Sequence, residues 1–195
     1  MSKRRVRVVR ANASRDGASM QRRAALLQIA SGMALAGIPC SSFATVYMSA
    51  AEAVALIFPG ETFNQQELVL TKPQMIEIER RCGNKVRVPK LELWRTERGG
   101  TVLIDRVTGK HELITYACGI SPDESIKQVE ILEYREVYGG QVRDARWRDQ
   151  FVGKRVGEPL KFDVEIRNIS GATLSCRHVT EGVQRLLASY QVAFK

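Results

Sequence analysis

Along the middle of the chain, apolar and polar residues alternate with the period of two that is typical of β-strands. The alternating runs are separated by turn residues such as Gly99-Gly100 and Pro122-Asp123. Four such runs cover residues 91–95, 101–105, 112–117 and 129–134, and a shorter apolar run at 68–70 predicts another strand. This arrangement predicts an antiparallel or mixed β-sheet.

Two short helices are predicted ahead of the alternating runs. Ser49 with Glu52, and Thr71 with Gln74, have the spacing of capping boxes, in which each side chain satisfies a free N–H group of the other residue. The second helix is expected to end at Gly83. The sequence therefore predicts where both helices begin.

Two further helices are predicted in the second half of the chain. Residues 145–152 favour a short helix, and apolar residues recur at helical spacing over residues 175–190. No internal repeat or low-complexity linker follows residue 44. The sequence predicts a single α+β domain over residues 45–195, with short helices beside the sheet and a C-terminal helix.

Residues 1–44 have the features of a targeting segment. A basic stretch ends in Arg22-Arg23, an apolar run covers residues 24–36, and small residues then lead to a signal-peptidase site after Ala44. The adjacent arginines resemble a twin-arginine export signal. The apolar run is shorter than the roughly 20 residues of a membrane span. We therefore expect an export signal and a periplasmic protein, with an uncleaved N-terminal anchor as the alternative.

The charge distribution argues against nucleic-acid binding. The formal net charge is +9, but residues 1–44 hold eight basic residues and one acidic residue, so only +2 remains in the predicted domain. A nearly neutral body offers no basic patch to displace phosphate counterions. We expect no nucleic-acid partner.

Metal and hydrolytic chemistry have little support in the sequence. Cys82, Cys118 and Cys176 lack metal or redox spacing, and His111 and His178 are the two histidines. There is no Walker loop, no G-x-S-x-G and no H-E-x-x-H. We expect structural thiols and no metal.

One segment before the C-terminal helix combines three hydroxyl side chains with a glycine. Small residues leave the backbone N–H groups of a helix N-terminus open, and these groups favour a phosphate. A hydroxyl there has the position to form a covalent bond to that phosphate. Alternatively, Ser170, Thr173 or Ser175 simply caps the helix. The segment reads Asn168-Ile169-Ser170-Gly171-Ala172-Thr173-Leu174-Ser175.

The Ser170-Gly171-Ala172-Thr173 motif resembles the flavinylation motif of the FMN-binding domain family. That family includes FMN-bearing subunits of the sodium-pumping NADH:quinone reductase and of Rnf-type complexes. The resemblance implies that Thr173 is joined to the FMN phosphate by a phosphoester bond, made by a dedicated flavin transferase. Family motifs often place Asp three residues before the serine, where this chain has Arg167.

The resemblance extends over roughly residues 90–190. A strand that ends in Glu is followed by a glycine loop and by Trp147-x-x-x-Phe151-x-Gly153-Lys154, in the order typical of the family. Trp147 and Phe151 are expected either to pack in the core or to stack near the flavin ring. A surface turn is the alternative for the glycine loop, and a solvated side chain for Lys154. The residues implied to bind the cofactor are Glu136, Gly139, Gly140, Lys154, Ser170, Gly171, Ala172, Leu174 and Ser175.

Together, these features predict a periplasmic electron-transfer flavoprotein that carries covalent FMN on Thr173. We expect an electron carrier rather than an enzyme. The expected partners are the flavin transferase and redox proteins at or near the membrane. Two alternatives remain: a non-redox exported protein-interaction module, and a flavin-dependent reductase with a small-molecule substrate.

Overall fold

The computed structural model describes residues 45–136, 138–155 and 157–194, and the predicted export segment 1–44 lies outside them. The described part contains a six-stranded sheet in the order β1-β6-β5-β4-β3-β2, and all of its neighbouring strands are antiparallel. This confirms the predicted α+β fold. The strands are β1 (Thr45–Val46), β2 (Phe63–Val69), β3 (Lys90–Thr96), β4 (Thr101–Thr108), β5 (Leu113–Ile120) and β6 (Ile126–Tyr134).

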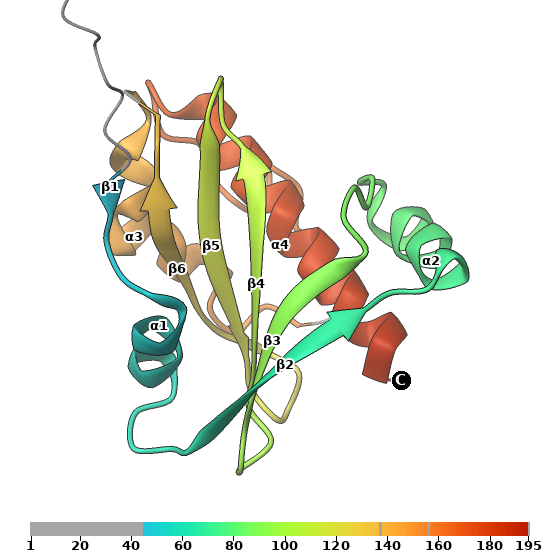
Figure 1. Ribbon diagram of the computed structural model, residues 1–195. Helices are drawn as coiled ribbons and strands as arrows, with labels where there is room; N and C mark the ends of the chain where they lie inside the picture. The colour runs from blue at the N-terminus through green and yellow to red at the C-terminus, as the bar shows by residue number, and fades with distance from the viewer. Residues whose placement is uncertain (1–44, 137, 156, 195) are drawn as a thin grey trace, which may run out of the picture. The chain divides into compact units, whose positions relative to one another are not determined.

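Helices pack on both faces of the sheet (Figure 1). The long helix α4 (Thr173–Phe194) crosses one face, and α2 (Lys72–Cys82) packs beside it. The short helix α1 (Ala50–Ile57) covers part of the other face. Two separate apolar clusters result, and the larger one lies between the sheet and α4.

Both predicted capping boxes are present. The Ser49 side chain accepts from the N–H of Glu52 at the start of α1, and the Glu52 carboxylate accepts from the N–H of Ser49. The same reciprocal pair starts α2 at Thr71. The helix α2 ends at Gly83 in the left-handed conformation (φ 72°), which glycine adopts without the steric cost of a side chain.

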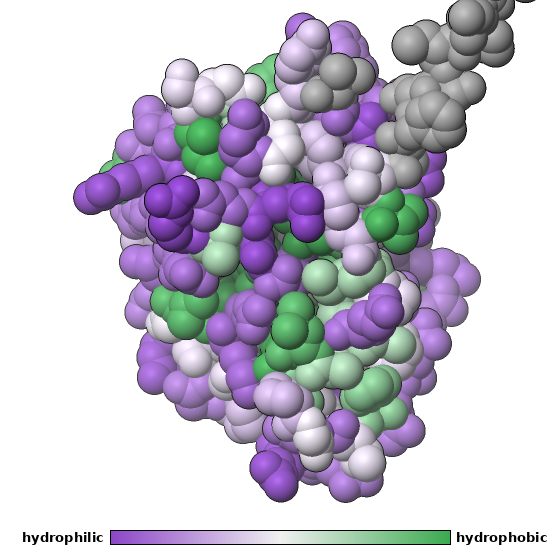
Figure 2. Space-filling view, turned by 90° about the vertical axis from the view of Figure 1, so that its left-hand side faces the viewer, coloured by the Kyte–Doolittle hydropathy of each residue, from purple (hydrophilic) through white to green (hydrophobic). Residues whose placement is uncertain are grey.

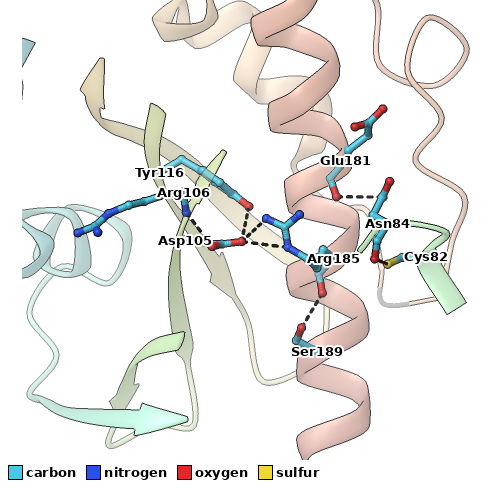
Figure 3. A network of polar contacts seen from close by, with 8 residues as sticks. All are labelled: Cys82, Asn84, Asp105, Arg106, Tyr116, Glu181, Arg185 and Ser189. Carbon is cyan, nitrogen blue, oxygen red and sulfur yellow. Dashed lines mark hydrogen bonds and ion pairs between the residues drawn. The ribbon is translucent and has the colours of Figure 1, made fainter. Parts of the chain in front are cut away.

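A largely buried ion pair fixes α4 on the sheet (Figure 3). Arg185 of α4 donates from Nε and Nη2 to one oxygen of Asp105 on β4, at 3.2 and 2.5 Å. The hydroxyl of Tyr116 on β5 lies 3.4 Å from the same oxygen, and burial raises the pKa of this tyrosine well above its usual value. A Cβ atom at Gly182 would collide with the Tyr116 side chain, so glycine is needed for this close approach.

The boundaries of several elements differ from the prediction. Strand β2 begins at Phe63 rather than at residue 68. The prediction missed its first half because the polar residues there are exposed and give no alternating pattern. Strand β1 is only two residues long and was not predicted. The helix predicted over 145–152 is a single α-turn, α3 (Ala145–Arg148), which continues as a 3₁₀ turn, η2 (Asp149–Phe151).

The side of the molecule that carries β1, α1 and α3 has a mixed surface, in which apolar patches are interrupted by polar residues (Figure 2). A short 3₁₀ helix, η1 (Gly140–Arg143), precedes α3 on this side. Within the described ranges, no helix is both long and apolar enough to cross a membrane.

Candidate functional site

The Ser170-Gly171-Ala172-Thr173 motif forms a tight turn that leads directly into α4. The N–H of Ala172 donates to the carbonyl of Ile169 at 2.9 Å, which closes a β-turn over residues 169–172. Gly171 takes the third position with φ 84°, a left-handed conformation that favours glycine. The glycine of the motif is therefore explained by the turn itself.

Ala172 occupies the N-cap position of α4. The helix begins at Thr173, and the first helical bond runs from the N–H of Cys176 to the carbonyl of Ala172 at 2.9 Å. The methyl group of Ala172 cannot accept a hydrogen bond, and it is buried, with 2% of the residue exposed. None of Ser170, Thr173 and Ser175 stands at the N-cap, so the capping alternative does not describe this helix.

Thr173 presents its hydroxyl to solvent at the first position of α4. The residue is exposed, and its Oγ1 accepts a hydrogen bond from Nδ2 of Asn168 at 3.1 Å. Backbone N–H groups in the first turn of a helix carry a partial positive charge and point away from the helix body. The Thr173 hydroxyl therefore lies where a phosphate group is favoured.

Ser175 has a different role from Thr173. It is buried, and its hydroxyl lies 2.9 Å from the hydroxyl of Tyr134, the last residue of β6. The Tyr134 hydroxyl donates its single proton to the carbonyl of Tyr138 at 2.5 Å, so Ser175 is the donor in the bond to Tyr134. This short chain of bonds ties the glycine loop to the start of α4.

Gly139 allows the glycine loop to lie directly on the motif. It has φ 90°, and a Cβ atom there would stand 2.6 Å from the Tyr134 hydroxyl, 2.8 Å from Ser175 Oγ and 3.6 Å from Ala172 Cα. The structure thus brings this predicted glycine against the motif. Gly140 follows at the start of η1.

The Glu136 carboxylate binds a turn of the sheet. Its Oε1 accepts from the N–H groups of His111 and Glu112, at 2.5 and 2.9 Å, in the connection between β4 and β5. Partial burial alone would raise the pKa of Glu136, but the backbone N–H groups of this turn hold it below its ordinary value. Nδ1 of His178 on α4 lies 3.1 Å from the carbonyl of Gly109 in the same turn. Glu136 therefore supports the end of the sheet beside the glycine loop.

Trp147 and Phe151 pack in the core, which is one of the two roles expected for them. Their rings meet edge to face with centroids 5.3 Å apart, and both side chains are buried. Nε1 of Trp147 donates to the carbonyl of Arg167 at 2.8 Å, while Oε1 of Gln150 accepts from the N–H of Arg167 at the same distance. These two hydrogen bonds fix the backbone of Arg167, in the segment just before the motif.

Two adjoining hollows lie beside the motif. One, of about 540 Å³, is lined by Gly171 and by residues 138–141. The other, of about 360 Å³, is lined by Asn168, Arg146 and Trp147 among others, and Gln141 borders both hollows. Both are shallow hollows that open widely to solvent rather than enclosed cavities.

Lys154 lies at the far end of β6 from the motif. Its carbonyl accepts from the N–H of Ile126, the first residue of β6, whereas Ser175 bonds to Tyr134, the last. A strand of nine residues spans about 26 Å from its first residue to its last. The structure brings Glu136, Gly139 and Gly140 to the region of the motif, but it does not bring Lys154 there.

Several residues of this region were not singled out in the sequence. Asn168 contacts Thr173, Gln141 borders both hollows, and Tyr138 is 81% exposed at the edge of one of them. The hollows depend on tertiary contacts between distant segments, and the contact of Asn168 with Thr173 depends on the local turn at Gly171; periodicity reports neither. The proximity of Asn168 to the motif was the one available signal.

A separate pocket of about 320 Å³ lies between α4, β4 and the segment after α2. Its lining includes Asp105, Arg185 and His178, and it contains no residue of the Ser170–Thr173 motif. The Asp105–Arg185 contacts drawn in Figure 3 anchor α4 on the sheet and do not involve the motif.

The fold and the site define a single-domain α+β protein that presents an exposed threonine hydroxyl at the N-terminus of its last helix. Residues 109–188 match the model of a family described as FMN-binding domain. This match confirms the family resemblance predicted from the sequence. The matched segment, which is less than half of the chain, is therefore similar to an FMN-binding domain, and this similarity supports a flavin-binding protein. No curated protein matches the chain.

The match includes the glycine loop, the segment around Trp147 and the Ser170–Thr173 motif. It begins in the turn between β4 and β5 and ends near the C-terminus of α4. The wider boundary of residues 45–195 for the flavin-binding domain stays a prediction.

Proposed function

We propose that the protein is a periplasmic electron-transfer flavoprotein that carries FMN covalently, through a phosphoester bond between the FMN phosphate and Thr173. The observation that carries this proposal is the placement of Thr173. Its hydroxyl is exposed at the first position of α4, while the N-cap position is held by an alanine that makes no side-chain cap.

The residues around Thr173 fit a phosphate group. The N–H groups of the first turn of α4 provide hydrogen-bond donors and the positive end of the helix dipole. Arg146, whose side chain is 90% exposed, lines the hollow that also contains Asn168. The Arg146 guanidinium is paired with Asp144, so the phosphate would be held mainly by the backbone donors of α4.

The surface beside the motif fits the flavin ring. The hollow lined by Gly139 and Gly171 lies next to the tether, and glycine lets a flat ring approach the backbone closely. Tyr138 and Leu174 are 81% and 41% exposed, and they offer apolar surface near this place. Bound FMN supplies the electron chemistry, while the protein positions the ring and tunes its potential.

A covalent tether suits a protein outside the cytoplasm, because a dissociable cofactor would be lost by dilution there. The proposal therefore includes export through residues 1–44 and attachment of FMN by a flavin transferase. The mature protein would exchange electrons with redox proteins at or near the membrane. Fractionation of cells that express wild type or Arg22→Lys/Arg23→Lys tests the twin-arginine route. Unchanged export of the double variant contradicts that route.

Co-expression with a flavin transferase tests the attachment. Wild type is expected to keep yellow colour and flavin fluorescence after denaturation, Thr173→Ala to lose both, and Ser170→Ala to keep both. A wild-type chain that releases all flavin on denaturation contradicts the covalent link. Turnover of a small-molecule donor by the isolated holoprotein favours a reductase over a carrier.

A further inference from the structure

The amide of Asn168 is the one side chain that the structure shows bonded to the Thr173 hydroxyl among the described residues. Its Nδ2 donates to Thr173 Oγ1 at 3.1 Å, across the β-turn that contains Gly171. Both residues are exposed, so the bond lies at the surface where a modifying enzyme has access. A threonine in a helix divides between two χ1 rotamers, and this bond favours one of them.

The direction of this bond leaves the proton of the Thr173 hydroxyl unbound. A threonine oxygen has two lone pairs and one proton. The Asn168 N–H occupies one lone pair, which leaves the other free to attack and leaves the proton free for a base. A carboxylate in place of the amide would accept the hydroxyl proton and would compete with that base.

The chain around Asn168 is fixed from the core. The preceding residue, Arg167, has its carbonyl bonded to Trp147 and its N–H bonded to Gln150. These bonds use only the backbone of Arg167, whose residue is exposed. Related motifs often have aspartate at the position of Arg167. Because only its backbone is used, the arginine side chain does not disturb the bonds to Trp147 and Gln150, and Asn168 stays directed at Thr173.

We propose that Asn168 is a positioning residue that orients the Thr173 hydroxyl for covalent flavinylation; this inference rests on the proposed function. In that step the Thr173 oxygen forms a bond to the phosphorus of the flavin mononucleotide half of a flavin dinucleotide. The diphosphate bridge breaks, a nucleoside monophosphate leaves, and the hydroxyl proton passes to a base of the transferase. No group is oxidised or reduced.

Transferase kinetics with purified acceptor proteins and flavin adenine dinucleotide test the proposal. Asn168→Ala and the near-isosteric Asn168→Leu both remove the donor, and Asn168→Gln restores an amide on a longer side chain. Asn64→Ala is the matched control, because Asn64 is an exposed asparagine on β2 for which no side-chain bond is described. Mass spectrometry gives the rate of modification, and thermal unfolding gives the stability of each variant.

We expect kcat to fall roughly tenfold in Asn168→Ala and Asn168→Leu, because misplacement of a reacting group slows reaction without weakening encounter. The KM for the acceptor protein and the melting temperature should stay at their wild-type values, and Asn168→Gln should recover part of the rate. A wild-type rate in Asn168→Ala, or a loss that appears only in KM or stability, overturns the positioning role. Absence of modification in wild type itself would instead refute the proposed function.

Discussion

The hydroxyl of Tyr134, at the end of β6, lies 2.9 Å from the hydroxyl of Ser175 in the first turn of α4. The two residues are 41 positions apart in the chain, and their contact joins the sheet to the start of the helix that carries Thr173. Tyr134 also donates to the carbonyl of Tyr138. A single phenol group thus joins the glycine loop to the first turn of α4.

Removal of this phenol group should loosen the site without unfolding the domain. Tyr134→Phe leaves the ring in the core but removes the hydrogen-bond partner of the Tyr138 carbonyl and of the Ser175 hydroxyl. We expect a loss of about 1–2 kcal/mol in the free energy of unfolding, measured by urea denaturation. Ser175→Ala and the double variant complete the cycle. If the loss in the double variant equals the sum of the two single losses, the two hydroxyls are not coupled as described.

Gly139 should tolerate substitution much less well than another glycine of similar backbone conformation. Gly139→Ala brings a Cβ atom to 2.6 Å from the Tyr134 hydroxyl, and we expect a loss of about 3 kcal/mol from strain and overlap. Gly153 also has a positive φ, of 79°, but an added Cβ atom meets nothing within 4 Å. Gly153→Ala should therefore cost only about 1 kcal/mol. Equal losses in the two variants would show that Gly139 is required for conformation alone.

Local signals in the sequence were sufficient for the starts of α1 and α2 and for most of α4, but not for the short α3 or for the turn of the motif. The capping boxes at Ser49 and Thr71 mark the starts of α1 and α2, and helical spacing marks α4. Alternation found β3 to β6, where one or both faces are buried. It failed for most of β2, because an exposed edge strand has no reason to alternate.

The candidate site could be predicted only in part. The resemblance pointed to Thr173 and to the glycine loop, and the structure places Gly139 against the motif. Lys154 follows the same family order but lies at the other end of β6. Its distance from the motif depends on how α3 and η2 pack on the sheet, which no local pattern encodes. The contact between Asn168 and Thr173 depends in the same way on the turn at Gly171.

The pH dependence of stability should report on Glu136. Its pKa in the folded protein is lowered, so its contribution to stability is complete above its ordinary pKa, near 4.5, and is lost as the pH falls through the lower folded value. Glu136→Gln should therefore be less stable than wild type at pH 7, by about 2 kcal/mol. Urea denaturation from pH 7 to pH 3 should show the two proteins converging at the acidic end. A constant difference across that range would mean that the Glu136 charge does not hold the turn between β4 and β5.

Trp147 should matter to the motif through one hydrogen bond. Trp147→Phe keeps an aromatic ring against Phe151 but removes the donor to the carbonyl of Arg167. We expect faster amide hydrogen exchange over residues 167–173, together with slower flavinylation of Thr173. Exchange that increases throughout the core instead would mean that the substitution acts by loss of packing.

The central claim is that FMN is esterified to Thr173. The most direct test is the intact mass of the denatured protein after co-expression with a flavin transferase, followed by fragmentation of the peptide that contains residues 168–175. The account predicts one added FMN, joined with loss of water and located on Thr173, and no addition in Thr173→Ala. An unmodified wild-type chain, or FMN located on another residue, contradicts it.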